Sequence, residues 1–406
     1  MRLDRRDVRA AGPGGPVSRG RRGRARLGPA TVSLHGGGRE LRAGDPVVPP
    51  IVQSATFKFA APGNGDLIYT RYGNNPIQEL VGRKVAELEG MEAGLVLGSG
   101  MAATAMTLLA LTESGDHVVA SDQLYGATWT LLAEELPRRG VETTFVDPDH
   151  PAAWRRALRK RTRLLFLETP TNPKLRIHDP RPVAALAHER GLPLVMDTTL
   201  ASPVNLRAGE LGADLVIHSA TKYLGGHSDL IAGVVAGSAA LVERVTTMMK
   251  LYGPAVDPLG AWLLDRGLRT LDVRVRRQNE SALALALWLA EQPRVRSVIH
   301  PGLPSHPDHA LAAEILDGFG GMVSFVLKGG GSAADAFMGA LAVAIPAPSL
   351  GGVETLVSQP RHTSHAGMSA AARKRIGITD GLVRVSVGVE DLADLIADFE
   401  SALRSA

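Results

Sequence analysis

Short apolar runs alternate with amphipathic segments over the first part of the chain, from about residue 93 to residue 237. The runs are short enough to predict strands, and the segments between them have the apolar spacing of helices. The expected strands are 93–97, 117–121, 141–147, 163–168, 192–197 and 214–219, and the expected helices are 101–111, 126–136, 152–161 and 182–190. Strands that are apolar on both faces and alternate with helices predict a mostly parallel α/β sheet. The segment 231–237 is expected to close that sheet.

The pattern changes after about residue 255. A helix-rich stretch runs to Glu291, and strand-like runs follow at 322–327 and 382–387. The chain closes with a helix whose apolar residues share one face: Leu392, Leu395, Ile396, Phe399 and Leu403. The run K-G-G-G-S at 328–332 is expected to be a turn. The expected organisation is a disordered tail at 1–28, an N-terminal arm at 29–62, a large domain at 63–255 and a smaller C-terminal α+β domain at 256–406.

Positive charge is concentrated at the N-terminus. The chain has 45 basic and 41 acidic residues, a net charge of +4, but residues 1–28 hold nine arginines against only Asp4 and Asp7. This Gly-, Pro- and Arg-rich segment has no apolar periodicity, which favours disorder. A basic arm also suits nucleic acid or an anionic membrane, although we expect neither as a partner. No apolar region follows the arginines, which excludes a secretory signal, whereas composition leaves a transit peptide open.

Composition excludes several kinds of protein. The length of 406 residues predicts two or three domains at about 150 residues each. The absence of cysteine excludes disulfide scaffolds, thiolate metal sites and cysteine nucleophiles. No apolar run approaches the roughly 20 residues that cross a bilayer, so we expect a soluble, cytoplasmic protein. Lysine is scarce, and lysine chemistry depends on eight positions: 58, 84, 160, 174, 222, 250, 328 and 374.

The segment G-S-G-M-A-A at 98–103 follows a predicted strand and opens a predicted helix. The free N–H groups at a helix N-terminus bind phosphate, so the segment predicts a phosphate site. It also fits the dinucleotide motif G-x-G-x-x-A, with Asp122 about 20 positions further on as the ribose acid. An NAD-dependent dehydrogenase is therefore a remote alternative, which leaves Lys222, Asp197 and Arg384 without a role.

The segment H-S-A-T-K-Y-L-G-G-H at 218–227 places Lys222 just beyond a predicted buried strand. A lysine there points into the crevice where α/β proteins bind ligands. The hydroxyls of Ser219 and Thr221 can hydrogen-bond a phosphate, and Asp197 ends the strand at 192–197. A pyridoxal site needs a lysine for the Schiff base and a carboxylate that keeps the ring nitrogen protonated. Tyr125, just after a third strand, is suited to stacking on the ring.

These segments resemble the family of PLP-dependent Cys/Met metabolism enzymes, which includes cystathionine γ-synthase, cystathionine γ-lyase, methionine γ-lyase and the homoserine-ester sulfhydrylases. The resemblance covers about residues 30–406. It is carried, in order, by Y-T-R-Y-G-N-N-P (69–76), E-L-E-G-M-E-A (87–93), G-S-G-M-A-A, Y-G-A-T (125–128), E-T-P-T-N-P (168–173), M-D-T-T (196–199), L-G-A-D-L-V-I-H-S-A-T-K-Y-L-G-G-H (211–227), S-L-G-G-V-E-T-L (349–356) and L-V-R-V-S-V-G-V-E-D (382–391). It implies fold type I of the PLP-dependent transferases, with a mostly parallel seven-stranded sheet in the large domain and a smaller C-terminal α+β domain.

The resemblance implies pyridoxal 5′-phosphate as the cofactor and gives roles to the matching residues. Lys222 would hold the cofactor as a Schiff base and shuttle protons. Gly100 and Met101 would give backbone N–H groups to the phosphate, helped by Ser219 and Thr221.

Further roles concern the ring and the substrate. Tyr125 would stack on the ring and assist the exchange of amines, Asp197 would pair with the ring nitrogen, and Asn172 would lie near the ring hydroxyl. Arg384 would bind the substrate α-carboxylate through its planar fork, with Ser349 in the same substrate site.

The same resemblance implies a homo-oligomer. Tyr69 and Arg71 would reach the phosphate of the neighbouring subunit. A dimer is then the minimal active unit, and a tetramer made of two dimers is the expected assembly.

The chain departs from the family pattern in three places. One extra residue precedes Pro76 and Ile77 replaces a threonine, which affects the local loop, and Thr198 replaces an asparagine. Pro348 stands where a glutamate commonly precedes S-L-G-G by one position. The carboxylate that could hold the distal amine of cystathionine is missing there, which argues more against a cystathionine lyase than against a synthase.

The motif P-R-H-T-S-H at 360–365 puts His362 and His365 near the expected site. No carboxylate or thiolate partner is adjacent in the sequence, so we expect a structural or proton-relay role and no metal.

The expected reaction is γ-replacement or γ-elimination on a homoserine ester or a sulfur amino acid, with the outcome decided by the wall that receives the nucleophile. A β-lyase, or a secondary-metabolic relative that acts on an unusual γ-substituted amino acid, is the alternative.

Overall fold

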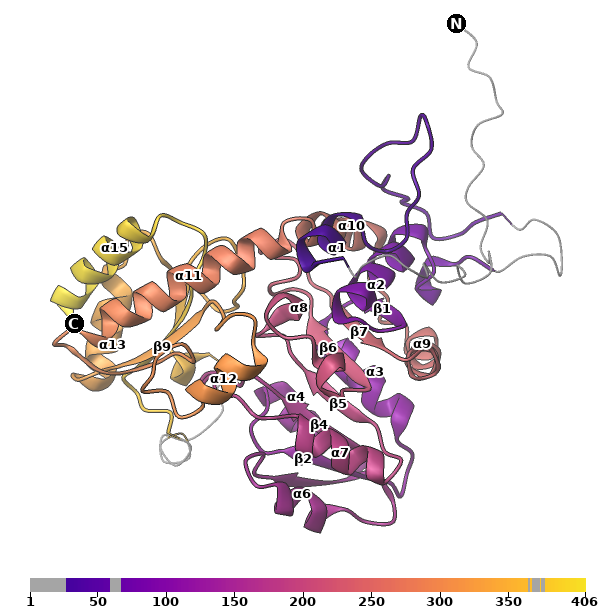
Figure 1. Ribbon diagram of the computed structural model, residues 1–406, viewed down its shortest axis with the longest axis horizontal. Coiled ribbons are helices and arrows are strands. Elements are labelled where there is room, and N and C mark those ends of the chain that lie inside the picture. The colour runs from indigo at the N-terminus through magenta and orange to yellow at the C-terminus, as the bar shows by residue number, and fades with distance from the viewer. Residues whose placement is uncertain (1–26, 59–66, 364–365, 367–372, 374–376) are drawn as a thin grey trace, which may run out of the picture.

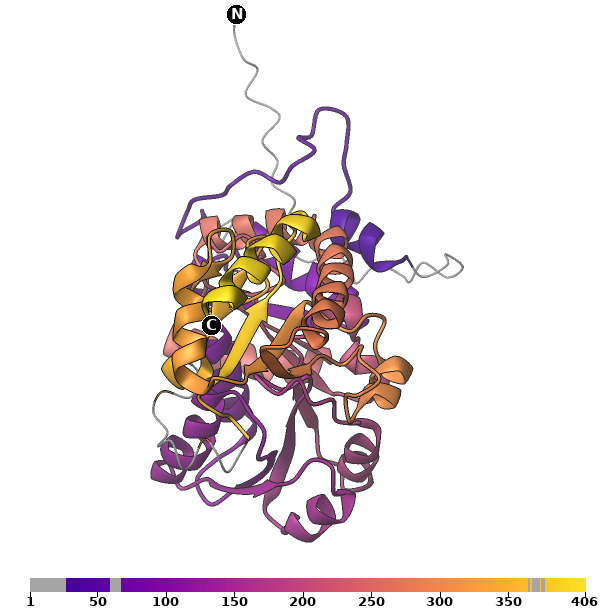
Figure 2. The ribbon, with the colours of Figure 1, turned by 90° about the vertical axis from the view of Figure 1, so that its left-hand side faces the viewer.

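The computed structural model describes residues 27–58, 67–363, 366, 373 and 377–406, and it contains two sheets that lie side by side (Figures 1 and 2). The predicted tail at 1–28 therefore lies outside the described residues except for its last two. The division into the four predicted segments remains an expectation. Within the described residues, no helix is long and apolar enough to cross a membrane.

The larger sheet has seven strands in the order β1-β7-β6-β5-β4-β2-β3. Their bounds are Ala93–Leu97 (β1), His117–Ser121 (β2), Glu142–Val146 (β3), Thr162–Glu168 (β4), Leu194–Asp197 (β5), Leu215–Ser219 (β6) and Gly233–Gly237 (β7). All neighbours pair in parallel except β7, which is antiparallel to both β1 and β6. The mostly parallel α/β sheet is thereby confirmed. The strand expected at 231–237 does not close the sheet at an edge but is inserted between two strands.

Helices cover both faces of this sheet (Figure 1). They are α2 (Pro76–Glu89), α3 (Gly100–Leu111), α4 (Gly126–Thr130), α5 (Leu136–Arg138), α6 (Pro151–Ala157), α7 (Arg181–Glu189), α8 (Ser202–Asn205) and α9 (Ala239–Tyr252), and a π-helical segment, Leu131–Glu135, joins α4 to α5. The helix expected at 152–161 ends early, at Ala157. The backbone N–H of Arg159 donates to Thr162 Oγ1 at 2.8 Å, and this turn leads directly into β4.

Close contact between backbones fixes α2 on the sheet. A side chain at Gly82 would bring a Cβ within 2.4 Å of the Gly94 carbonyl oxygen, so the helix can approach β1 only at a glycine. The start of α2 is held by Asn75, which accepts from Ile77 N and forms a capping box with Gln78.

The smaller sheet has the order β10-β11-β12-β9-β8. Its strands are β8 (Val295–Ile299), β9 (Met322–Leu327), β10 (Ile345–Pro346), β11 (Leu356–Ser358) and β12 (Leu382–Ser386), and its accompanying helices are α11 (Leu271–Ala290), α12 (His309–Ile315), α13 (Gly330–Ala340) and α15 (Leu392–Ser405). Helices α1 (Pro29–His35) and α10 (Pro258–Leu268) pack instead against α2, beside the larger sheet (Figure 1). The predicted turn at 328–332 is wrong in part, because α13 begins at Gly330.

Helices α11, α13 and α15 pack on one face of this sheet (Figure 2). Phe325, Phe337 and Phe399 form the centre of that core with edge-on ring contacts. The alternation along β12 turns Val383 and Val385 into the core and leaves Arg384 on the face toward the larger sheet. The packing of the smaller sheet thus presents one arginine to the carboxyl edge of β4, β5 and β6.

Candidate active site

A cavity of about 720 Å³ lies at the carboxyl edge of the larger sheet and is closed on one side by residues of the smaller sheet and its loops. Ten of the twelve predicted site residues line it: Gly100, Met101, Tyr125, Asn172, Asp197, Ser219, Thr221, Lys222, Ser349 and Arg384. The fold therefore brings together residues that are up to 284 positions apart in the sequence.

The N-terminus of α3 forms one end of the cavity. Ser99 caps the helix by accepting from Ala102 N at 3.0 Å, while the N–H groups of Gly100 and Met101 have no partner among the described residues. A Cβ at Gly100 would lie 2.7 Å from Ser219 Cβ, so only glycine leaves this space open. Free N–H groups, an open space and a neighbouring hydroxyl fit a phosphate.

Lys222 points from the end of β6 across the cavity to the smaller sheet. Its Nζ donates to Ser349 Oγ at 2.8 Å. Burial, with the nearby Arg384 guanidinium as a second cause, lowers the pKa of Lys222 to about 8. Ser349 has φ +90, a conformation that is costly for a residue other than glycine and that is typical of functional sites.

Asp197 ends β5 and faces the cavity. It accepts from Thr199 N at 3.0 Å, and burial raises the pKa of its carboxyl group. Among the residues that the structure describes, no cationic side chain donates a hydrogen bond to the Asp197 carboxylate. A carboxylate in this position is stabilised by a positively charged group in the cavity, which fits the protonated ring nitrogen of pyridoxal phosphate.

Glu168 is a second carboxylate at the same edge, and no role was predicted for it. It ends β4, pairs in register with Asp197, and accepts from Tyr125 N at 2.6 Å. Burial, and next the charge of Asp197, raise the pKa of Glu168. The apolar run R-L-L-F-L-E at 163–168 ends in an acidic residue, as does L-P-L-V-M-D at 192–197. That shared pattern could have identified Glu168 as a site residue from the sequence.

Arg384 is only 5 % exposed and has no carboxylate partner among the described residues. Its Nη1 donates to Asn172 Oδ1 at 3.2 Å and its Nη2 to the Ser349 carbonyl at 2.9 Å, whereas its buried Nε has no partner. Burial lowers the pKa of this guanidinium to about 10. An unpaired buried guanidinium beside an amide is suited to bind a carboxylate.

Tyr69 and Arg71 do not line the cavity. The Arg71 guanidinium instead lies over the rings of Tyr69 and Tyr72, at 5.5 and 4.9 Å, and donates to the Lys250 carbonyl. Their predicted contact with the phosphate of another subunit remains a prediction.

The other predicted positions fall in different places. Asp122 follows β2 but does not line the cavity, so the predicted pairing of G-S-G-M-A-A with this acid is not found. Thr198 is fully buried and does not line the cavity, so the replacement of an asparagine by threonine at this position leaves the cavity wall unchanged. His362 and Pro348 do line it, and His365 lies outside the described residues. No cluster of three potential metal ligands occurs among the residues that the structure describes.

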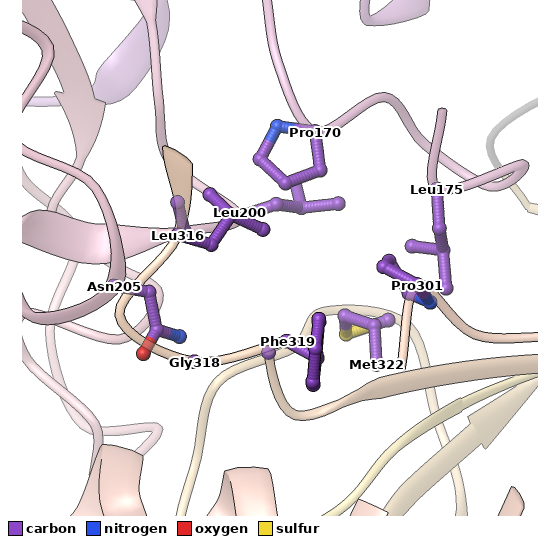
Figure 3. Close-up of a pocket in the computed structure, with 11 residues that line it drawn as sticks. Pro170, Leu175, Leu200, Asn205, Pro301, Leu316, Gly318, Phe319 and Met322 are labelled. Atoms are coloured by element: carbon purple, nitrogen blue, oxygen red, sulfur yellow. The ribbon is translucent and has the colours of Figure 1, made fainter. Parts of the chain in front are cut away.

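A second, much smaller pocket lies behind Leu200, which also lines the main cavity (Figure 3). Its volume is about 10 Å³, and its wall is mostly apolar, with Pro170, Leu316, Phe319 and Met322 among the side chains. Because it has room for no more than about one water, we assign it to packing between the two sheets.

Residues 30–404 match the protein family described as "Cys/Met metabolism PLP-dependent enzyme". The chain is 40 % identical to L-methionine gamma-lyase of Pseudomonas putida, over 93 % of this chain and 97 % of that protein. It is also 40 % identical to cystathionine gamma-lyase of Bacillus subtilis, over 92 % and 99 % of the two chains. The solved structure of cystathionine gamma synthase from Xanthomonas oryzae pv. oryzae superposes with a TM-score of 0.89 at 40 % identity and covers 93 % of this chain and 98 % of that one.

Proposed function

The chain belongs to the family of Cys/Met metabolism PLP-dependent enzymes, and from this membership we propose that its cavity catalyses γ-replacement or γ-elimination on a γ-substituted amino acid. A homoserine ester or a sulfur amino acid is the expected substrate. The observation that carries the proposal is the meeting of Lys222, Asp197 and Arg384 in one cavity. The predicted resemblance, fold class and cofactor are confirmed by the family match and the relatives.

Pyridoxal 5′-phosphate supplies an electron sink that stabilises negative charge at the carbons of a bound amino acid. We propose that Gly100 and Met101 hold its phosphate through their free N–H groups, with Ser219 and Thr221 at the same end of the cavity. Asp197 pairs with the ring nitrogen, and Tyr125, 44 % exposed at the cavity surface, covers the ring.

Lys222 serves as the acid and base of the reaction. Its Nζ removes the Cα proton of the substrate and returns a proton later, which is efficient because a pKa of about 8 lies close to neutral pH. The hydroxyl of Ser349, 2.8 Å from Nζ, holds the amine toward the smaller sheet.

Arg384 orients the substrate. Its guanidinium is already oriented by a hydrogen bond to the Asn172 amide, so the α-carboxylate of a substrate binds to a group that the protein has positioned beforehand. The carboxylate also satisfies the buried Nε, which otherwise has no partner.

The wall near Pro348 decides between replacement and elimination. Pro348 and Ser349 line the cavity there, and no acidic side chain of the described lining stands on that wall. A distal amine is therefore poorly held, which favours a synthase over a cystathionine lyase. A β-lyase or a secondary-metabolic relative remains the alternative, because the same lysine and arginine serve those reactions.

We also propose that the enzyme is a homo-oligomer with sites shared between subunits and that it works in the cytoplasm. Arg71 and Tyr69 lie outside the cavity of their own chain, and Arg71 donates to the Lys250 carbonyl on α9. The end of α9 exposes Leu251 and Tyr252 at 72 % and 57 %, an apolar surface that a partner subunit would cover. A tetramer made of two dimers is the expected assembly.

Proton NMR in D₂O tests the proposed reaction. The holoenzyme is given an O-acyl homoserine with and without cysteine. We expect the β protons to exchange and 2-oxobutyrate or cystathionine to form, with the dependence on cysteine separating lyase from synthase. Exchange confined to the α proton would show that the cofactor chemistry is right and the γ-reaction wrong, in favour of the β-lyase alternative.

A further inference from the structure

His362 lies on the same side of the cavity as Arg384, although the two residues are 22 positions apart in the sequence. Ser358 of β11 pairs in register with Arg384 of β12. A 3₁₀ turn, Pro360–His362, follows β11 after one residue, and four residues span at most about 14 Å. His362 and Arg384 therefore line the cavity from neighbouring segments of the smaller sheet.

The turn that carries His362 is anchored at its base. Arg361 donates from Nη2 to Asp335 Oδ1 and from Nε to Gln359 Oε1, both at 2.6 Å, and Gln359 donates to the same Asp335 oxygen at 2.8 Å. Arg361 also approaches Gly331 so closely that a Cβ there would lie 2.4 Å from Nη1. The backbone at His362 is thus positioned by contacts that do not involve its own side chain.

The imidazole itself is left free. It is 62 % exposed and makes no hydrogen bond among the described residues. The nearest carboxylate oxygen, of Asp335, lies 3.9 Å from Nε2, which is too far for a hydrogen bond. An imidazole has at least one N–H donor in either protonation state, so His362 offers a donor to the cavity.

The charges of the cavity lining favour an anion beside His362, and the one carboxylate near the imidazole, Asp335, lies outside the lining and is paired with Arg361. Its two carboxylates, Glu168 and Asp197, are at the strand ends of the larger sheet. The residues that line it on the side of His362 include Pro348, Thr363 and Arg384, and none of those described is acidic.

We propose that His362 binds a carboxylate at the far end of the amino-acid substrate while Arg384 binds the α-carboxylate. The assignment rests on the proposed function, since it takes Arg384 as the α-carboxylate site. The distal carboxylate has two possible sources with the same chemistry. It belongs either to the acyl group that leaves from Cγ, as in a succinyl ester, or to the amino-acid thiol that replaces it.

The first test measures binding without turnover. L-α-aminoadipate and L-norleucine have chains of similar length, but only the former ends in a carboxylate, and neither has a leaving group at Cγ. Their binding to the holoenzyme is followed by the cofactor absorbance. We expect aminoadipate to bind about tenfold more tightly, as one hydrogen bond to a charged group allows, and His362→Ala to remove this preference.

Two controls make the binding test specific. Norleucine should bind His362→Ala as it binds the unmodified enzyme, which shows that the cavity is intact, and His362→Lys should retain the preference. His150→Ala removes an exposed histidine that also lies near an aspartate but outside the cavity, and it should change nothing. Equal binding of the two probes by the unmodified enzyme, or a preference that survives in His362→Ala, would overturn the proposal.

The second test identifies the source of the carboxylate. Values of kcat/KM are compared for O-succinyl- and O-acetyl-homoserine, and for cysteine and 2-mercaptoethylamine as the thiol. A loss of about tenfold in His362→Ala confined to the succinyl ester assigns the leaving group, and one confined to cysteine assigns the thiol. A loss in neither arm contradicts a role in the reaction. If the unmodified enzyme turns over no ester, the proposed function fails while the binding test still decides the role of His362.

Discussion

The two sides of the cavity differ in how rigidly the fold holds their functional groups. On the side of the larger sheet, the functional groups stand at the ends of buried strands, and Glu168 is only 3 % exposed. On the side of the smaller sheet only Arg384 stands on a buried strand, whereas Ser349 adopts a strained backbone conformation and His362 projects from a turn with 62 % of its side chain exposed. The first side holds groups that suit the cofactor, and the second holds groups that suit the substrate.

This difference has a physical basis. Strand ends in a parallel sheet are fixed by pairing with neighbouring strands, as Glu168 is by its register with Asp197, so they can keep charged groups in place against the cost of burial. Turns such as 360–362 are held by side chains at one end and tolerate substitution at the other. We infer that in this chain the groups suited to the cofactor depend on the larger sheet, while the turns beside Arg384 add to substrate choice.

Replacing Lys222 by alanine should have the largest effect, because this residue stands at the centre of the cofactor side. We expect turnover to fall on the order of 10²–10⁴-fold, the usual contribution of a positioned acid and base. The absorbance of the lysine-bound cofactor should disappear as well. Lys160→Ala, which changes a lysine on the surface outside the cavity, should behave like the unmodified enzyme. Full activity in Lys222→Ala would refute the assignment of the site.

Replacing Arg384 by alanine should separate the two sides. The variant should bind the cofactor normally but raise KM for amino acids by an amount that corresponds to about 2–5 kcal/mol, because a buried charge pair is lost. Arg384→Lys should recover only part of the loss, since an ammonium group cannot contact both Asn172 and the substrate carboxylate as a planar fork does. Steady-state kinetics with a homoserine ester measures both variants. An unchanged KM would show that the α-carboxylate binds elsewhere.

Features that depend on residues close together in the chain were predicted from the sequence, whereas features that depend on distant residues were not. The strands β1 to β6 were predicted because their apolar periodicity is local, and Lys222 and Asp197 followed from their places at strand ends. The insertion of β7 between β1 and β6 was not predicted, because pairing partners far apart in the chain leave no local pattern.

The site shows the same division. Glu168 was given no role because its position beside Asp197 depends on the register of β4 with β5. The free imidazole of His362 could not be foreseen, since it depends on the contacts of Arg361 with Asp335 and Gln359. Tyr69 and Arg71 were predicted to act on another subunit only through the family resemblance.

The pKa of Lys222 depends on both sides, through burial and through Arg384. Only the neutral amine attacks the aldehyde of free pyridoxal phosphate, so recombination of the apoenzyme with the cofactor should accelerate as pH rises and level off above about 8. An unshifted lysine, with a pKa of 10.5, would react on the order of a hundredfold more slowly at pH 8. Stopped-flow absorbance measures the profile. In Arg384→Ala the midpoint should move upward, because a positive charge that lowers the pKa is gone.

The smallest effect is expected for Gly100→Ala, which tests the cofactor side without removing a functional group. The added methyl would lie 2.7 Å from Ser219 Cβ, so the neighbouring backbone must shift, and such overpacking costs about 1–3 kcal/mol. We expect the dissociation constant of pyridoxal phosphate to rise accordingly while KM for the amino acid changes little. Gly339→Ala is the matched control, because that glycine also lies in a helix and a Cβ there meets nothing within 4 Å. If Gly100→Ala raised KM and left cofactor affinity unchanged, the α3 end of the cavity would belong to the substrate, and the division between the two sides would be wrong.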